Sequence, residues 1–211
     1  MALENLYQCT PSQLQDLPEK LAEAFYFSPL FQIAFPDEAK RKECMVFYFK
    51  QYLYAIAPEA LFLADSEDMH TIMIVCDSRR YQQKEYYKRL CKMNLRFIRF
   101  VKKIGAKQCL YLIKHWDMFS SRWMKDFKRK HHFHLDMIIT DATTRNHGIA
   151  ERMVRELIDE GDIMDMDVSA EVYQKDTALW LEKMGFILMN TIVDEENDLH
   201  QYCLINQQHK E

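Results

Sequence analysis

The segment from Met137 to Leu157 contains the residues whose order points most clearly to chemistry. An apolar strand is followed by a short polar turn without proline, then by Gly148 and a helix with one apolar face. At such a junction the first backbone N–H groups of the helix have no partner within it, and they point outward at the positive end of the helix dipole. Gly148 lets the backbone approach an anion closely because it has no side chain. The pattern predicts an anion site, although many strand–turn–helix connections bind nothing.

Three histidines lie just before this segment, and their surroundings do not favour a metal site. His131, His132 and His134 are close in sequence, but no cysteine or carboxylate lies at ligand spacing nearby. Alternation along a strand places His132 and His134 on one face and His131 elsewhere. We therefore predict no metal and interpret the pair as part of a strand edge at the surface.

The elements that must position these residues follow from the spacing of apolar side chains. Helical spacing predicts helices over residues 13–25, 35–58, 84–104, 107–130, 148–160 and 175–184. Short runs rich in apolar and β-branched residues predict strands over residues 59–65, 70–76, 133–140, 163–173, 186–193 and 199–205. Gly105, Gly161 and Gly185 each follow a predicted helix and are expected to end it. The three tryptophans are expected in the core or in a pocket wall.

The composition favours one reduced, compact domain. Only 4 glycines and 5 prolines occur in 211 residues, and 48% of the residues are hydrophobic, which is ample for a buried core. The six cysteines are far apart and form no C-x-x-C pair, so disulfides are not expected. No window approaches the roughly 18 apolar residues of a membrane span, and no basic leader precedes an apolar stretch. We expect a cytoplasmic α+β protein with a single domain over residues 1–211 and no membrane partner.

Charge is divided unevenly along the chain, whose formal net charge is −4. Residues 79–130 carry 17 Lys and Arg against 3 Asp and Glu, a net charge of +14, so the remainder of the chain carries −18. A basic segment could attract nucleic acid or a phosphate-rich ligand. Because the charges recur at helical spacing rather than in one block, we interpret them as solvated helix faces and do not expect a nucleic-acid partner.

Two motifs in the last third of the chain occur at a characteristic distance from each other. One is the loop from Arg145 to Ala150, which has the form R/Q-x-x-G-x-G/A, and the other is the strand–helix segment from Ala170 to the Gly-Phe ending at Phe186. Together they resemble the GNAT superfamily of N-acetyltransferases. Residues 24–36, with A-F, S-P-L-F and F-P, are similar to the subgroup that includes puromycin-type acetyltransferases. The resemblance is most specific over residues 133–190.

The resemblance implies a single GNAT-like domain: a mixed, strongly bent sheet with helices on both faces, and acetyl-coenzyme A between two central strands that splay apart. The loop amides from Asn146 to Ala150 would hold the pyrophosphate, and three strand residues would pair with the pantetheine arm. Thr177 stands where the family often has an Asn that contacts the coenzyme. The predicted coenzyme-binding residues are Ile138, Ile139, Thr140, Arg145, Asn146, His147, Gly148, Ile149, Ala150 and Thr177.

The resemblance also implies acetyl transfer to an amine, and one catalytic position departs from the family. The family commonly has a Tyr four residues before the Gly of the Gly-Phe ending, where its hydroxyl can protonate the departing thiolate; that position here is Leu181. Tyr173 or solvent would then serve as the acid, or the protein would no longer catalyse transfer. Glu171 aligns with an acidic position frequent in the subgroup, and Asp136 is a second candidate base. Either carboxylate could instead be an exposed strand residue.

We therefore expect an acetyl-coenzyme A-dependent N-acetyltransferase with acetyl-coenzyme A as cosubstrate. Its acceptor would be a small-molecule or amino-acid-like amine bound against the aromatic N-terminal helices. The alternative within this fold is a catalytically degenerate or regulatory coenzyme A-binding protein, which Leu181 favours. A nucleic-acid-associated binding protein would explain the basic segment but not the two motifs. The sequence leaves the oligomeric state open, a homo-oligomer included.

Overall fold

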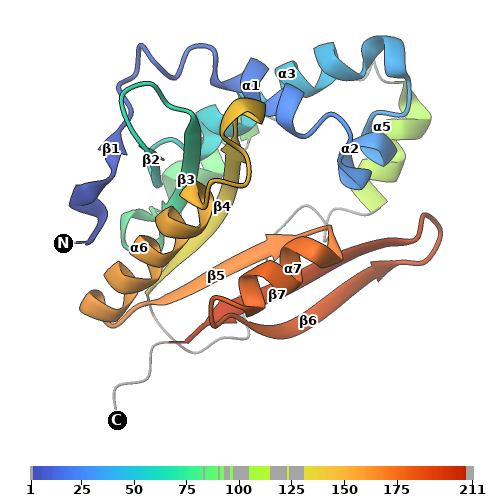
Figure 1. Cartoon of the computed structure of the whole chain (residues 1–211). Helices are drawn as coiled ribbons and strands as arrows, with labels where there is room; N and C mark the ends of the chain where they lie inside the picture. Colours follow the sequence, from blue (N-terminus) through green and yellow to red (C-terminus); the bar gives the residue numbers. More distant parts are fainter. Residues whose placement is uncertain are drawn as a thin grey trace.

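The computed structural model in Figure 1 covers the whole chain. It describes residues 2–82, 84–89, 91–92, 96, 105–114, 123 and 131–207. Most of the helix predicted over 84–104, the part of the next one beyond residue 114, and Trp116 lie outside these residues. Within the described part of the chain, no helix is both long and apolar enough to cross a membrane.

Seven strands form one mixed sheet. Their order across the sheet is β1-β2-β3-β4-β5-β7-β6; β4 and β5 are parallel neighbours, and the other described pairs are antiparallel. The strands are β1 (Tyr7–Gln8), β2 (Ala60–Ala64), β3 (Thr71–Asp77), β4 (His132–Thr140), β5 (Asp167–Val172), β6 (Ile187–Asp194) and β7 (Leu199–Asn206). All six predicted strands are present, and the predicted hairpin of β2 and β3 is confirmed.

Helices cover both faces of this sheet (Figure 1). One face carries α6 (Ile149–Met164) and α7 (Lys175–Glu182), and the other carries α1 (Leu17–Ala24), α2 (Pro29–Ala34) and α3 (Glu38–Ile56). A further helix, α5 (Ala106–Lys114), contacts α2 through Gln108 Nε2, which donates to the carbonyl of Ile33 (2.6 Å). The predicted α+β class, with a mixed sheet between two helical layers, is confirmed.

Each helical layer has its own apolar core, so the sheet is buried on both sides. The first core, on the α6 face, contains Met153 and Leu157 of α6 together with Leu181 of α7, all 0–1% exposed. The second, on the α3 face, contains Phe49 of α3 and Phe31 of α2. Burial of apolar surface at roughly 25 cal/mol per Å² makes these two cores the main source of stability.

The helix boundaries differ from prediction in several places. The helix α1 begins at Leu17, because Pro18 suits the first turn of a helix, and α2 was not predicted. The prediction that Gly161 ends α6 is wrong: Gly161 is buried within the helix, which continues to Met164, and Asp165 in the left-handed conformation follows it. The strand β5 therefore starts later than predicted. α3 starts at Glu38, three residues after the predicted start, and Asp37 is its N-cap, whose side chain accepts a hydrogen bond from Ala39 N.

The sheet divides at its centre, between β4 and β5. The two strands pair only from His132 opposite Asp167 to Leu135 opposite Ala170. Beyond Leu135, β4 continues to Thr140 beside β3 alone. Figure 1 shows the two halves of the sheet running in clearly different directions, with β1 to β4 on one side and β5 to β7 on the other. The predicted bend and splay of the central strands are both present.

A β-bulge lies where the two strands part. Val75 of β3 pairs with Leu135 and Ile74 with Met137, so Asp136 has no partner in the ladder. A bulge turns two successive side chains to the same face of a sheet. Asp136 and Met137 accordingly both face α3, whereas Leu135 and Ile138 contact the first core.

Candidate active site

The loop before α6 presents unpaired backbone N–H groups. Gly148 is the N-cap of α6, with a left-handed φ of 74°, and no side chain caps the helix. The first helical hydrogen bond runs from Arg152 N to Gly148 O (3.0 Å), so the N–H groups from Ile149 to Glu151 have no acceptor within the helix. Asn146 also has a left-handed φ, 64°. Backbone turns of this kind aim several N–H groups at one point, which suits an anion.

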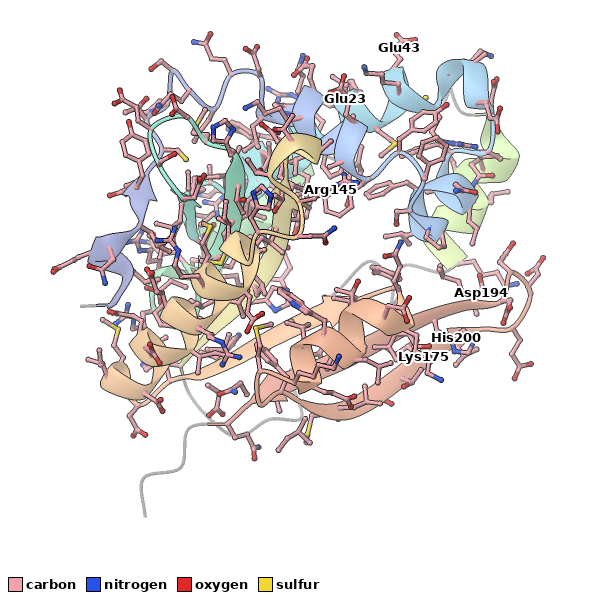
Figure 2. All side chains as sticks on the ribbon, in the orientation of Figure 1. Glu23, Glu43, Arg145, Lys175, Asp194 and His200 are labelled. Carbon is pink, nitrogen blue, oxygen red and sulfur yellow. The ribbon has the colours of Figure 1, made fainter. Side chains whose placement is uncertain are left out.

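The surroundings of this loop are open and contain a cationic side chain, that of Arg145. A Cβ on Gly148 would meet nothing within 4 Å, so its positive φ, rather than crowding, requires glycine here. Arg145 and His147 are exposed, and Figure 2 shows Arg145 at the start of α6. Glu151, in the first turn, would repel an anion, but it forms an ion pair with Arg155 (2.8 Å). The loop therefore has the geometry and the charge to hold a phosphate.

The predicted pantetheine-binding residues lie at the free edge of β4. Ile138 contacts the first core and Ile139 the second, while the hydroxyl of Thr71 donates to that of Thr140 (3.2 Å). On the side that faces β5, none of the described strands pairs with this stretch. An extended ligand can hydrogen-bond such an edge as a further strand would.

The other side of the parting is formed by β5 and the start of α7. Thr177 lies in the first turn of α7, is half-buried, and donates its backbone N–H to Gln174 O (3.1 Å). The structure thus places α6 and α7 after the two strands that part, each with its N-terminus at the same end of the sheet. The predicted contact of Thr177 with a coenzyme stays a prediction.

Glu171 is not the exposed strand carboxylate that one reading of the sequence allowed. Its side chain is 12% exposed on β5, and the indole N–H of Trp123 donates to its Oε1. His134 of β4 lies beside it, with Nε2 at 3.7 Å from Glu171 Oε2 and Nδ1 at 2.9 Å from Ser169 Oγ. Trp123 is 6% exposed, so the expectation that it lies in the core or a pocket wall is confirmed.

Asp136, on the bulge, has one carboxylate oxygen that accepts a hydrogen bond and one that accepts none from the described residues. The hydroxyl of Tyr52, from α3, donates to Asp136 Oδ1 (2.6 Å). Oδ2 is buried and accepts no hydrogen bond from the described residues. Burial raises the pKa of Asp136, and the nearby charge of Glu171 raises it further, against His134 and the Tyr52 hydrogen bond, which lower it. A carboxylate with a raised pKa and an unused oxygen is a stronger base than an exposed aspartate, so it can accept a proton from a ligand.

Tyr173 and Leu181, the two residues considered for the acid, lie on opposite faces of the sheet. Leu181 is 1% exposed in the first core, on the α6 face. Tyr173 packs against the second core, and burial raises its pKa well above the usual value for a tyrosine, as does the charge of Glu171. Tyr173 therefore keeps its proton at neutral pH, and its hydroxyl can donate a hydrogen bond to a ligand.

These residues form one group, which we call the polar face. It consists of Tyr52, Trp123, His134, Asp136, Glu171 and Tyr173. The sequence identified both carboxylates and Tyr173, but not Tyr52 or His134 as their partners. A bulge at Asp136 and the packing of α3 on β4 bring these side chains together. The local sequence pattern predicts neither the bulge nor the packing.

The interpretation of the histidine pair as a surface strand edge is wrong. β4 lies in the middle of the sheet, between β3 on one side and its parallel neighbour β5 on the other, so it is not an edge strand. The side chain of His134 is 12% exposed, and burial lowers the pKa of His132 to about 4, so His132 is neutral at neutral pH. Among the described residues, no group of three His, Cys, Asp or Glu side chains is arranged to hold a metal ion.

Comparison with known proteins identifies the fold. No family model matches the sequence, and no curated protein matches it either. A solved structure from Corynebacterium glutamicum, described as histone acetyltransferase HPA2 and related acetyltransferase, superposes with a TM-score of 0.67 at 14% identity, covering 98% of this chain and 97% of that one. The C-terminal condensation domain of Ebony, in complex with β-alanyl-dopamine, gives 0.63 at 9% identity, over 95% and 96%.

A third structure carries the family name that the sequence motifs suggested. It is a proposed GNAT-family acetyltransferase from Desulfovibrio desulfuricans, with a TM-score of 0.51 at 11% identity, covering 96% of this chain and 97% of that chain. At these identities the likeness shows the fold and not the reaction. The predicted GNAT fold is confirmed, and the narrower likeness to puromycin-type acetyltransferases stays a prediction.

Proposed function

We propose that residues 1–211 form one acetyltransferase domain that transfers the acetyl group of acetyl-coenzyme A to the amine of a small molecule. The observation that carries the proposal is the parting of β4 and β5. At that one place lie an uncapped helix N-terminus, a free strand edge and a carboxylate with an unused oxygen, Asp136 Oδ2. The helix N-terminus suits the phosphates of the coenzyme, the free strand edge suits its extended arm, and the carboxylate suits the amine of the acceptor.

Coenzyme binding would use the loop and the free edge of β4. The backbone N–H groups from Asn146 to Ala150 would bind the pyrophosphate, with Arg145 adding charge and His147 a further hydrogen-bonding group from the exposed loop. The backbone of residues 138–140 would pair with the pantetheine arm, and Thr177 would contact it from α7. This arrangement would direct the thioester toward the bulge at Asp136.

The polar face would bind the acceptor and remove its proton. A substrate ammonium is attracted to the carboxylates of Asp136 and Glu171, and it must lose a proton before its nitrogen can attack. As the new N–C bond forms and the C–S bond breaks, one of these carboxylates would take the amine proton. Asp136 has an oxygen without a partner among the described residues, and Glu171, held by Trp123, lies close enough to raise the pKa of Asp136, so we assign the proton transfer to the two carboxylates acting together.

The departing thiolate would be stabilised from β5. Tyr173 retains its hydroxyl proton because its pKa is raised, and it can donate a hydrogen bond to a thiolate. Its proton is held too tightly for full transfer to a thiolate of ordinary pKa, so solvent would deliver the final proton. Leu181 takes no part, since its side chain lies in the core on the other face.

A coenzyme-binding protein without catalysis is the second candidate, and the absence of a tyrosine at position 181 is the observation that favours it. The fold is compatible with either candidate: among its structural neighbours, the Ebony domain is described as a condensation domain rather than an acetyltransferase. The polar face favours the enzyme, because a buried carboxylate with a free oxygen serves no purpose in binding the coenzyme alone.

Two measurements on the purified protein test the proposal. Coenzyme A and acetyl-coenzyme A should each raise the melting temperature, by an amount that grows with the logarithm of ligand concentration above the dissociation constant. Thiol release from acetyl-coenzyme A should then depend on added amine across a panel of primary amines. A melting temperature unaffected by either coenzyme would contradict the proposal, and binding without amine-dependent release would favour the second candidate.

A further inference from the structure

Gln201, on β7, is a fully buried polar residue whose side chain has no hydrogen-bond partner among the described residues. It is 0% exposed, and among the described residues neither its Oε1 nor its Nε2 has a partner. Its neighbours on the same face of β7 are Leu199 and Cys203, both buried at 0–2% exposure. An apolar side chain would fit this setting without the cost of an unsatisfied amide.

The strand register places Gln201 beside the polar face. It pairs with Ile192 of β6, whose side chain packs on the second core, as does that of Leu199. On the other side β7 pairs with β5, with Glu171 opposite Cys203 and Val172 opposite Tyr202. The next position along each strand brings Tyr173 and Gln201 to neighbouring sites on the face that Glu171 shares.

The distance from Gln201 to the carboxylates follows from sheet geometry. Gln201 is one strand across and two residues along from Glu171, which corresponds to roughly 8 Å between the two Cα atoms at ordinary strand spacing and rise. One ligand can therefore reach both residues if its amine and a second polar group are separated by a short chain. An amide is uncharged and both donates and accepts hydrogen bonds, so the second group would be a hydroxyl or an amide.

We propose that Gln201 determines acceptor specificity by hydrogen-bonding an uncharged polar group of the acceptor, while Asp136 and Glu171 receive its amine. This inference rests on the proposed function and narrows its substrate class to amino alcohols and amino amides. It disfavours amino-acid-like acceptors, because a substrate carboxylate would approach two carboxylates and an uncharged amide. A polar group of the ligand would then satisfy the amide that the protein leaves unpaired.

The test compares three amines of similar length: aminopentanol, hexylamine and aminohexanoic acid. The wild-type protein should prefer aminopentanol to hexylamine by about tenfold in kcat/KM, because only the alcohol can make a hydrogen bond to the Gln201 amide. It should use aminohexanoic acid least. In Gln201→Met, which is similar in size but apolar, the preference for aminopentanol should disappear, with hexylamine used as well as before.

The same substitution at an exposed glutamine, Gln8→Met on β1, serves as the matched control and should leave the preference unchanged. The melting temperature without ligand gives a second readout: Gln201→Met should match or exceed the wild type, because it removes an unsatisfied buried group. A preference that survives in Gln201→Met, or a melting temperature that falls by several degrees while the preference stays, would overturn the assignment. Equal use of all three amines by the wild type would overturn the assignment and leave the proposed function standing, whereas transfer to no primary amine at all would contradict both.

Discussion

The loop before α6 and the polar face both lie where β4 and β5 part, and they are built differently: the loop follows β4, whereas the polar face takes side chains from both strands and from α3. The loop is exposed, and its binding groups are backbone N–H groups of consecutive residues, Asn146 to Ala150. The polar face is buried, and its groups are side chains brought from distant parts of the chain: Tyr52 and Asp136 are 84 residues apart. The loop needs only a local conformation, whereas the polar face needs the whole sheet in register.

This difference predicts different consequences of substitution in the two regions. A change in the loop that preserves the fold should weaken coenzyme binding and leave the polar face intact. A change in the polar face should slow acetyl transfer, or shift its pH dependence, without altering coenzyme affinity. Effects that cross from one region to the other would show that the two are not separate.

Removing the two carboxylates should have the largest effect. Asp136→Asn and Glu171→Gln keep the size of each side chain and an oxygen that can still accept from Tyr52 or Trp123, but neither amide can take up a proton. Each should lower kcat by about 10²–10⁴-fold, the usual contribution of a general base, with the coenzyme dissociation constant unchanged. Steady-state kinetics and calorimetry measure the two quantities. Full activity in Asp136→Asn would show that Glu171 alone acts as the general base.

Gly148→Val should weaken coenzyme binding by about tenfold or more. Valine tolerates a φ of 74° poorly, at a cost of about 1–3 kcal/mol, so the loop would change its conformation and its N–H groups would no longer converge. Titration of coenzyme A by calorimetry gives the affinity.

Gly105→Val is the matched control for this variant. Gly105 also has a left-handed φ, 85°, with nothing within 4 Å of the position of a Cβ, but it precedes α5 rather than the loop. The two variants should lose similar stability, and Gly148→Val alone should lose affinity. Equal affinity in both would show that Gly148 serves the fold only.

Tyr52→Phe should have the smallest effect, visible in the pH profile. The Tyr52 hydroxyl stabilises the charged form of Asp136, so its loss raises the pKa of that carboxyl further. Because the base must be deprotonated to act, the acid limb of kcat/KM should move to higher pH, with little change on the plateau. A uniform fall in rate at every pH would instead indicate that Tyr52 only supports the packing of α3.

The same contrast explains what the sequence could predict. The loop was found from its own residues, since a strand, a polar turn, Gly148 and an apolar helix face all lie within 21 residues of chain. The six longer strands were found because alternation and β-branched content are local. The end of α6 was missed at Gly161, since a buried glycine inside a helix and one that ends it look alike without tertiary context.

The polar face was found only in part, for a physical reason. Glu171 and Tyr173 were selected as candidates, but the burial of Glu171, its contact with His134 and the pairing of Asp136 with Tyr52 depend on the strand order and on one bulge. The histidine pair was misplaced at a surface edge because alternation assigns a face, while only the topology tells which strands lie at the centre. Gln201 cannot be predicted in this way, since one glutamine in an apolar strand carries no signal of its own.

The most direct test of the account is to count both products of one reaction. The protein is mixed with acetyl-coenzyme A and aminopentanol, and mass spectrometry measures acetylated amine while a thiol assay measures free coenzyme A. We predict equal amounts of the two from the wild type, and neither above background from the double variant Asp136→Asn/Glu171→Gln, which should still bind the coenzyme. Undiminished acetylated amine from the double variant, or no acetylated amine with any primary amine from a wild-type protein that binds acetyl-coenzyme A, would contradict the account.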